Sequence, residues 1–294
     1  MHTLIFLSIF VFVVQVCPAQ ETLVACGDNQ VLIIKHDPFD QEDQEITWRW
    51  SVENAYELDP DFRKKMIPTD DCKPVANDTQ LLITSSGGGV ILLNIEDKKI
   101  EFHAQVPNAH SAELLPNGRI VVALSIANGG NALELFDPRH SNEPIYRDSL
   151  YSGHGVVWMP KHQRIFALGF DELRAYSLGA WSSDKPFLKK EHSWILPGES
   201  GHDLVAVSEN LLLLTTHEGA WSFQIPDEEF TPFAPLDTVP DIKSIFYRPE
   251  DGRIIYTKGE TRWWTHRIHC LEPNKILEFP EVKLYKTRVM EGAH

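Results

Sequence analysis

The chain has 294 residues and a formal net charge of −15, and no segment of it is a run of basic residues. This charge argues against a nucleic-acid duplex or an anionic membrane surface as a partner, because both repel acidic proteins. The length suits either one large all-β domain or two small domains.

The first nineteen residues have the pattern of a secretory signal peptide. A largely apolar stretch over residues 4–16 is too short to span a membrane, and Cys17, Pro18 and Ala19 follow it. We expect cleavage after Ala19 and export to the periplasm or the extracellular space. Lipid anchoring through Cys17 is the less favoured interpretation, since the bulky Val16 precedes this cysteine.

Short apolar stretches separated by tight turns make up the rest of the chain, which is typical of β-strands. Three strands are expected within residues 21–50, followed by a helical or irregular rim insertion over residues 52–70. From Asp71 onward a unit of strand, turn and strand recurs, with a basic or imidazole side chain near its start. These side chains are Lys73, His110, His154, His202, Lys243 and Lys286.

The spacing of these six side chains indicates the architecture. They lie 37, 44, 48, 41 and 43 residues apart, which is the period of a propeller blade made of four strands. One strand is left over at residues 283–289, and three strands are unpaired at the N-terminus. We therefore predict an all-β, six-bladed β-propeller, closed by a C-terminal inner strand that joins the N-terminal strands. It is expected to be a monomer with a single domain over residues 20–294.

The first strand of each blade lines the central channel, so the six recurring side chains should form a ring. The three imidazoles, from His110, His154 and His202, could hold one divalent transition metal such as Mn, Zn or Fe. The lysines would then bind an anionic group, and nearby carboxylates would orient the imidazoles. These lysines and carboxylates are Lys73, Lys243, Lys286, Asp71, Glu113 and Asp203. The alternative is that the histidines bond only to main-chain groups or channel water.

Such a ring favours a secreted protein that binds an anionic, carboxylated glycan or a similar ligand at the channel. Metal-assisted elimination or hydrolysis is the chemistry that the site would support, with Lys73, Lys243 or Tyr285 as the base. The rival hypothesis is a non-catalytic scaffold that binds protein or glycan through its rim and needs no metal.

Cysteines and tryptophans each have two interpretations. Cys26, Cys72 and Cys270 have no close spacing, so either Cys26 pairs with Cys270 or all three are buried thiols. The tryptophans could stack on sugar rings, although packing between blades is the more common role of aromatic residues in this fold. The tryptophans concerned are Trp48, Trp50, Trp158, Trp263 and Trp264.

Four segments carry a resemblance to a family of secreted bacterial propellers of unknown function. They are residues 71–75, 85–90, 107–116 and 149–158, and the resemblance extends over nearly the whole mature chain. It implies a propeller fold and export, but no activity. The three histidines alone resemble those of oligogalacturonate lyase, a propeller enzyme that holds Mn²⁺ with three histidines and a glutamine. That resemblance implies that His110, His154 and His202 are metal ligands, although this sequence has no evident matching glutamine.

Overall fold

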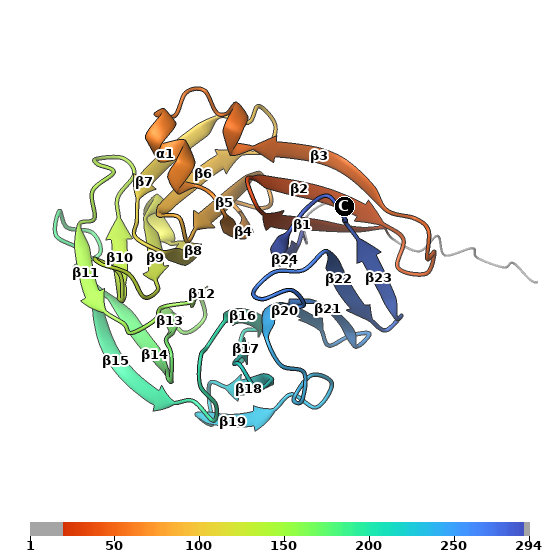
Figure 1. Ribbon diagram of the computed structural model, residues 1–294. Coiled ribbons are helices and arrows are strands. Elements are labelled where there is room, and N and C mark those ends of the chain that lie inside the picture. Colours follow the sequence, from red (N-terminus) through yellow and green to blue (C-terminus); the bar gives the residue numbers. More distant parts are fainter. Residues whose placement is uncertain (1–19, 291–294) are drawn as a thin grey trace, which may run out of the picture.

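The computed structural model describes residues 20–290, so the expected signal peptide lies outside the described residues. Within this range the chain forms six four-stranded antiparallel sheets. The sheets stand around a common axis as the blades of a propeller (Figure 1), which confirms the predicted fold. No helix in residues 20–290 combines the length and the apolar character needed to cross a membrane.

Each blade runs from an inner strand at the channel to an outer strand at the rim. Blade 1 contains β24 (Leu284–Val289), β1 (Glu21–Gly27), β2 (Gln30–His36) and β3 (Glu45–Ser51). Blade 2 contains β4 (Thr69–Val75), β5 (Gln80–Ser85), β6 (Gly89–Asn94) and β7 (Ile100–Gln105). Blade 3 contains β8 (Ala109–Leu114), β9 (Ile120–Leu124), β10 (Ala132–Phe136) and β11 (Tyr146–Ser149).

The remaining three blades follow in the same order. Blade 4 contains β12 (Gly155–Met159), β13 (Arg164–Leu168), β14 (Glu172–Gly179) and β15 (Phe187–Ile195). Blade 5 contains β16 (Asp203–Ser208), β17 (Leu211–Thr215), β18 (Ala220–Gln224) and β19 (Glu229–Pro232). Blade 6 contains β20 (Ile242–Arg248), β21 (Arg253–Lys258), β22 (Arg267–Leu271) and β23 (Lys275–Glu278).

Blade 1 closes the propeller because it takes strands from both ends of the described chain. The C-terminal strand β24 pairs with β1 in antiparallel fashion, with Val24 opposite Arg288 and Ala25 opposite Thr287. The Thr287 hydroxyl also donates to the Val24 carbonyl at 3.0 Å. This pairing leaves no seam between the first and last blades, which protects the strand edges from pairing with another chain.

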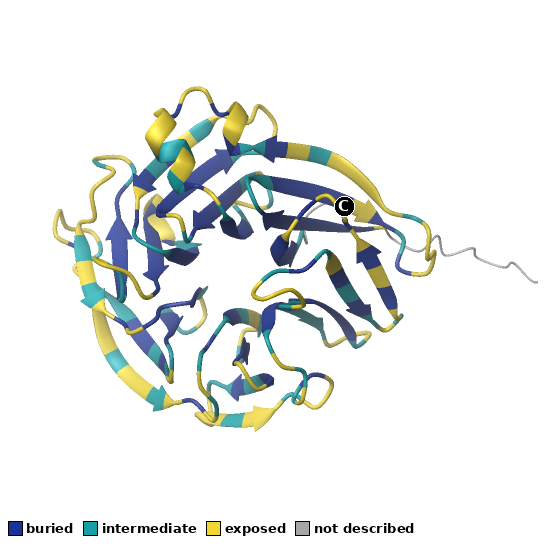
Figure 2. Cartoon of the chain, in the orientation of Figure 1, coloured by how far each residue is buried: buried dark blue, intermediate teal, exposed yellow. Residues whose placement is uncertain are grey.

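Six hydrophobic clusters fill the spaces between neighbouring blades. Between blades 1 and 2, for example, Cys26 and Ile33 lie in one cluster with Ile83 and Ile91. The middle strands are apolar on both faces because another blade covers each face; β17 reads Leu-Leu-Leu-Leu-Thr. Outer strands such as β15 are largely exposed, as Figure 2 shows.

The rim insertion between blades 1 and 2 is helical and shorter than expected. It contains a 3-10 helix, Val52–Asn54, and the α-helix α1, Pro60–Lys65. The carboxylate of Asp59 caps the first turn of α1, where proline is well tolerated. Strand β4 begins at Thr69, so Asp70 belongs to the inner strand of blade 2 and not to the insertion.

The three described cysteines, Cys26, Cys72 and Cys270, are free and buried. Cys26 and Cys270 lie in different hydrophobic clusters, on opposite sides of blade 1. The pairing of Cys26 with Cys270 is therefore not formed, and the thiols serve as small apolar side chains.

Candidate ligand site at one mouth of the central channel

Each inner strand carries one extra residue near its beginning. In β4, β8, β20 and β24, the pairing with the neighbouring strand shifts in register around a single residue. Just before β12, the His154 amide donates to the carbonyl of Leu168, the residue that pairs with Gly155. Just before β16, the His202 amide donates in the same way to Thr215, the residue that pairs with Asp203. Bulges of this kind turn a side chain out of the normal alternation and are common next to functional sites.

We call the six residues at these bulges the mouth ring. They are Asp70, His110, His154, His202, Lys243 and Tyr285. They lie 40, 44, 48, 41 and 42 residues apart, which is a more regular spacing than that of the predicted ring. The prediction was wrong at two positions, because Asp70 takes the place assigned to Lys73 and Tyr285 takes the place assigned to Lys286.

The three histidines of the mouth ring lie together, but their rings pack against one another. The ring centroids of His110 and His154 are 4.2 Å apart in a stacked arrangement, and those of His154 and His202 are 5.7 Å apart, nearly perpendicular. Burial lowers the pKa of all three imidazoles, that of His154 to about 4, so they are neutral at pH 7. His154 Nδ1 donates to the Ser152 carbonyl at 2.9 Å. The buried Nδ1 atoms of His110 and His202 have no hydrogen-bond partner in the described part of the chain.

Lys243 is the cation of the mouth ring. Its Nζ lies 2.9 Å from His202 Nε2 and 3.4 Å from Asp241 Oδ1. The same carboxylate oxygen lies 3.0 Å from His217 Nδ1. Burial lowers the pKa of Lys243, and Asp241 opposes this effect. An ammonium group with so little water around it interacts strongly with the carboxylate of a ligand.

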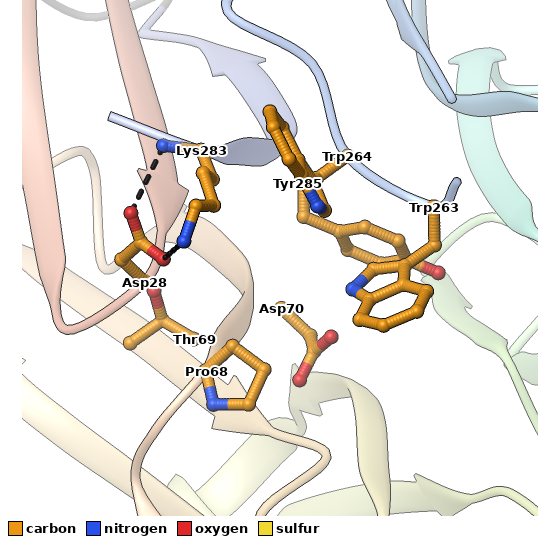
Figure 3. A pocket seen from close by; sticks show the side chains of 8 residues that line it. All are labelled: Asp28, Pro68, Thr69, Asp70, Trp263, Trp264, Lys283 and Tyr285. Atoms are coloured by element: carbon orange, nitrogen blue, oxygen red, sulfur yellow. Dashed lines mark hydrogen bonds and ion pairs between the residues drawn. The ribbon is translucent and has the colours of Figure 1, made fainter. Parts of the chain in front are cut away.

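Asp70 and Tyr285 form another part of the mouth together with the loop between β21 and β22. They line a cavity of about 140 Å³ with Trp263 and Trp264 of that loop. Figure 3 shows the Asp70 carboxyl group among these aromatic rings. Asp70 is only 3% exposed, and its Oδ2 accepts a hydrogen bond from the Ser86 amide. Burial raises the pKa of Asp70 to about 7 in spite of this hydrogen bond.

Below the mouth ring, four charged side chains form a buried ion cluster: Asp71, Asp203, Lys286 and Arg288. Arg288 donates to Asp71 at 2.8 Å and to Asp203 at 2.7 Å, and Lys286 Nζ lies 2.9 Å from Asp203 Oδ1. Burial alone would raise the pKa of both carboxyls, but the two cations hold it below its ordinary range. Three of the predicted ligand-binding residues therefore bind one another.

Lys73 and Glu113 lie at the opposite end of the channel. The residues three positions after the mouth ring line a separate cavity of about 260 Å³; they are Lys73, Glu113, Val157, Val205, Phe246 and Arg288. Three residues along a strand correspond to roughly 10 Å. Lys73 Nζ donates to Glu113 Oε2 at 3.0 Å and to the Val156 carbonyl. The structure thus separates Lys73 from Lys243 and Tyr285, the other two predicted bases.

One group in residues 20–290 has three metal-ligand atoms within 4.8 Å of one another: His202, His217 and Asp241. The predicted set of His110, His154 and His202 is not such a group. His217 lies between β17 and β18, outside the recurring first strand, so the sequence repeat offered no reason to include it in the site. Its side chain is 63% exposed, but its ring faces Asp241.

Some of the tryptophans pack between blades, and others are placed where they could stack on a sugar ring. Trp50 is buried, and Trp48 and Trp158 pack against the clusters between blades. Trp263 and Trp264 instead line the cavity beside Asp70. Asp70 was missed because it falls at the end of the polar segment interpreted as an insertion. Its distance of 40 residues from His110, close to the blade period, is the signal that could have identified it.

The fold and the mouth ring define this protein as a six-bladed β-propeller with a candidate ligand site at one end of its channel. The chain belongs to the family of unknown function DUF6528, which matches residues 14–293. This membership confirms the resemblance to a propeller family without a known activity. None of the curated proteins matches the chain.

Proposed function

We propose that the mouth ring binds a carboxylated glycan. The observation that carries the proposal is the gathering of an ammonium group, neutral imidazoles and aromatic rings around one channel mouth. Lys243 would pair with a uronate carboxylate. Trp263 and Tyr285 offer apolar faces to sugar rings.

The contrast with the rest of the channel supports this assignment. In the ion cluster, the charges of Lys286 and Arg288 are matched by Asp71 and Asp203. At the opposite mouth, Lys73 is matched by Glu113. Lys243 shares its carboxylate, that of Asp241, with an imidazole, and the 3.4 Å distance is long for a charge-assisted hydrogen bond. Lys243 is therefore the channel lysine best placed to exchange its partner for a ligand.

Calorimetry with a galacturonate trimer and its methyl ester tests the proposal. The acid form should bind, and methyl esterification or Lys243→Met should weaken binding at least about tenfold, because each removes one partner of the ion pair. Lys73→Met is the matched control at the other mouth and should leave affinity unchanged. Equal binding of acid and ester, an unaffected Lys243→Met variant, or no binding at all would overturn the proposal.

A second candidate is metal-assisted elimination or hydrolysis at the same mouth. The closeness of the ligand atoms of His202, His217 and Asp241 favours it, since two imidazoles and one carboxylate suit Zn, Mn or Fe. Elemental analysis of the mature protein tests it. One equivalent of metal that is lost in His217→Ala would support this candidate. An ion lost in a His110→Ala, His154→Ala double variant would instead support the histidine set expected from the sequence. No metal after reloading would remove the candidate.

A further inference from the structure

Among the residues that line the cavity beside Asp70, the one cation, Lys283, lies next to a carboxylate. The Lys283 amide donates to Asp28 Oδ2 at 3.0 Å, and Lys283 Nζ lies 3.7 Å from Asp28 Oδ1 (Figure 3). The lysine of the cavity thus already has a carboxylate partner, and Asp70 adds a second acidic group. The charges of Asp28 and Lys283 offset each other here, and Asp70 is uncharged in its acid form, so the cavity lining offers a uronate no net electrostatic attraction.

The walls of this cavity suit an uncharged sugar ring instead. Trp263 is 53% exposed, and the loop that carries it is tied down by bridges from Thr261 to Trp264 and from Thr265 to Leu284. Lys283 Nζ lies 5.6 Å from the centre of the Trp264 ring. Fixed aromatic faces lose little conformational entropy when a ligand stacks on them.

Asp70 provides the polar group of the cavity. Its Oδ2 accepts the Ser86 amide, and its carboxyl group borders the cavity lined by the two indoles and the Tyr285 ring. In its acid form a carboxyl group donates one hydrogen bond, which a sugar hydroxyl oxygen can accept. As a carboxylate it can only accept hydrogen bonds.

The charges around Asp70 balance, so burial decides its protonation. The titratable groups that face it from the neighbouring elements are Lys286, Asp71, Tyr285, Asp28 and Lys283. Two are cations and two are carboxylates. Burial raises the pKa of the Tyr285 phenol well above its ordinary value, so the phenol stays neutral at pH 7. With the pKa of Asp70 at about 7, the acid form is dominant below neutral pH.

We propose that the cavity of Asp70, Tyr285, Trp263 and Trp264 is a subsite for an uncharged sugar unit that receives a hydrogen bond from the Asp70 carboxylic acid. This inference rests on the proposed function, in which Lys243 takes a uronate. Tyr285 stands between Lys243 and Asp70 in the order of the blades, so the two units occupy neighbouring parts of one mouth. The ligand class is therefore an acidic heteroglycan in which a uronate is linked to a neutral sugar.

Two trisaccharides of equal length test the inference by calorimetry at pH 6. One contains one glucuronate and two xylose units, and the other is the galacturonate trimer. We expect the mixed probe to bind at least tenfold more tightly. Asp70→Ala and Trp263→Ala should each reduce the affinity for the mixed probe at least tenfold and leave the galacturonate trimer unaffected. Asp70→Asn should keep the affinity at pH 6, because its amide also donates a hydrogen bond.

The pH dependence gives a second readout that loss of folding would not reproduce. Between pH 6 and pH 8.5 the protein should lose affinity for the mixed probe, whereas Asp70→Asn should not. The subsite proposal is contradicted, and the proposed function is not, if the galacturonate trimer binds as tightly as the mixed probe or more tightly. The same holds if the substitutions at Asp70 and Trp263 leave the affinity for the mixed probe unchanged. If Lys243→Met affects neither probe, or neither probe binds, the proposed function fails and the subsite fails with it.

Discussion

Asp70 and Asp71 are neighbours in β4, yet they belong to two regions with opposite electrostatics. Asp71 lies in the ion cluster, where two hydrogen bonds from Arg288 help to hold the pKa of its carboxyl down. Asp70 lies in the mouth ring, where burial raises the pKa of its carboxyl to about 7. Both side chains are buried, so the presence of a cationic partner makes the difference. The charges of the ion cluster satisfy one another, and the unpaired polar groups of the mouth ring are left for a ligand.

The β-bulge at Asp70 creates this division. The register shift between Thr69 and Asp71 turns one carboxyl group toward the mouth and the next toward the channel interior. The same shift separates His110 from Ser111 and Lys243 from Ser244, and both serines are buried in the channel wall. Each blade therefore contributes one residue to the mouth ring and the next residue to the layer below it.

The largest effect on stability should come from the ion cluster. Arg288→Met leaves Asp71 and Asp203 with Lys286 as their remaining cation, and breaking a buried ion pair in this way costs about 3–5 kcal/mol. Urea denaturation at pH 7 measures the loss in the free energy of unfolding. A loss below about 1 kcal/mol would contradict a structural role for the cluster.

The next largest effect is a pH dependence of the free energy of unfolding, which should differ between variants of Asp70 and Asp71. The pKa of Asp70 is raised on folding, so its contribution to stability is present at pH 4 and is lost as the pH rises through about 7. Asp70→Asn should therefore gain roughly 2–4 kcal/mol relative to the parent at pH 8, and nothing near pH 4.

Asp71→Asn is the matched control for this pH dependence. The pKa of Asp71 is lowered on folding, so its contribution is present above the ordinary value of 3.8 and is lost at lower pH. This variant should be less stable than the parent at pH 8, and the difference should stay nearly constant down to pH 4, because Asp71 loses its contribution only at lower pH. Urea denaturation from pH 4 to pH 8 measures both variants. If the free energy of unfolding changed with pH in the same way in both variants, the two carboxyls would not lie in regions of opposite electrostatics.

A smaller effect is expected on the affinity of the mouth ring for Zn²⁺. Lys243 Nζ lies next to His202 Nε2 and Asp241 Oδ1, and both of these residues belong to the group whose ligand atoms lie close together. Lys243→Met should therefore raise the affinity for Zn²⁺ about tenfold, because it removes a competing charge. Adding His217→Ala should abolish the gain. Competition with a chelating dye measures the Zn²⁺ affinity. An unchanged affinity in Lys243→Met would show that Lys243 does not compete with the ion.

The smallest expected effect is on the stability of a mouth variant. Trp263 is 53% exposed, so Trp263→Ala should change the free energy of unfolding by no more than about 0.5 kcal/mol. Trp50, buried between blades 1 and 2, is the control, and its replacement by alanine should cost about 3–5 kcal/mol. Thermal denaturation compares the two. A large loss for Trp263→Ala would show that this indole stabilises the fold.

Much of the fold could be predicted because each blade repeats the same sequence of inner strand, turn and strand. The recurrence of His110, His154 and His202 gave the period, and the unpaired strands at the two ends gave the closure. The insertion was misplaced by two residues, since Thr69 and Asp70 are polar and follow a helical pattern without a clear break.

The candidate site was harder to predict because one residue of register changes which side chain reaches the mouth. The bulges at Asp70 and Tyr285 leave no mark in the pattern of apolar residues. The pairing of Arg288 with Asp71 and Asp203 joins three blades and depends on where the strands meet in space. Lysines that looked free in the sequence, such as Lys286, were therefore assigned to the ligand.

Hydrogen–deuterium exchange with and without the galacturonate trimer tests most directly which part of the channel binds a ligand. We predict slower exchange around His202 and Lys243. Residues 204–207 and 245–247, which line the opposite mouth, should be unchanged. Protection confined to the opposite mouth, or to neither mouth, would contradict the assignment of ligand binding to the mouth ring.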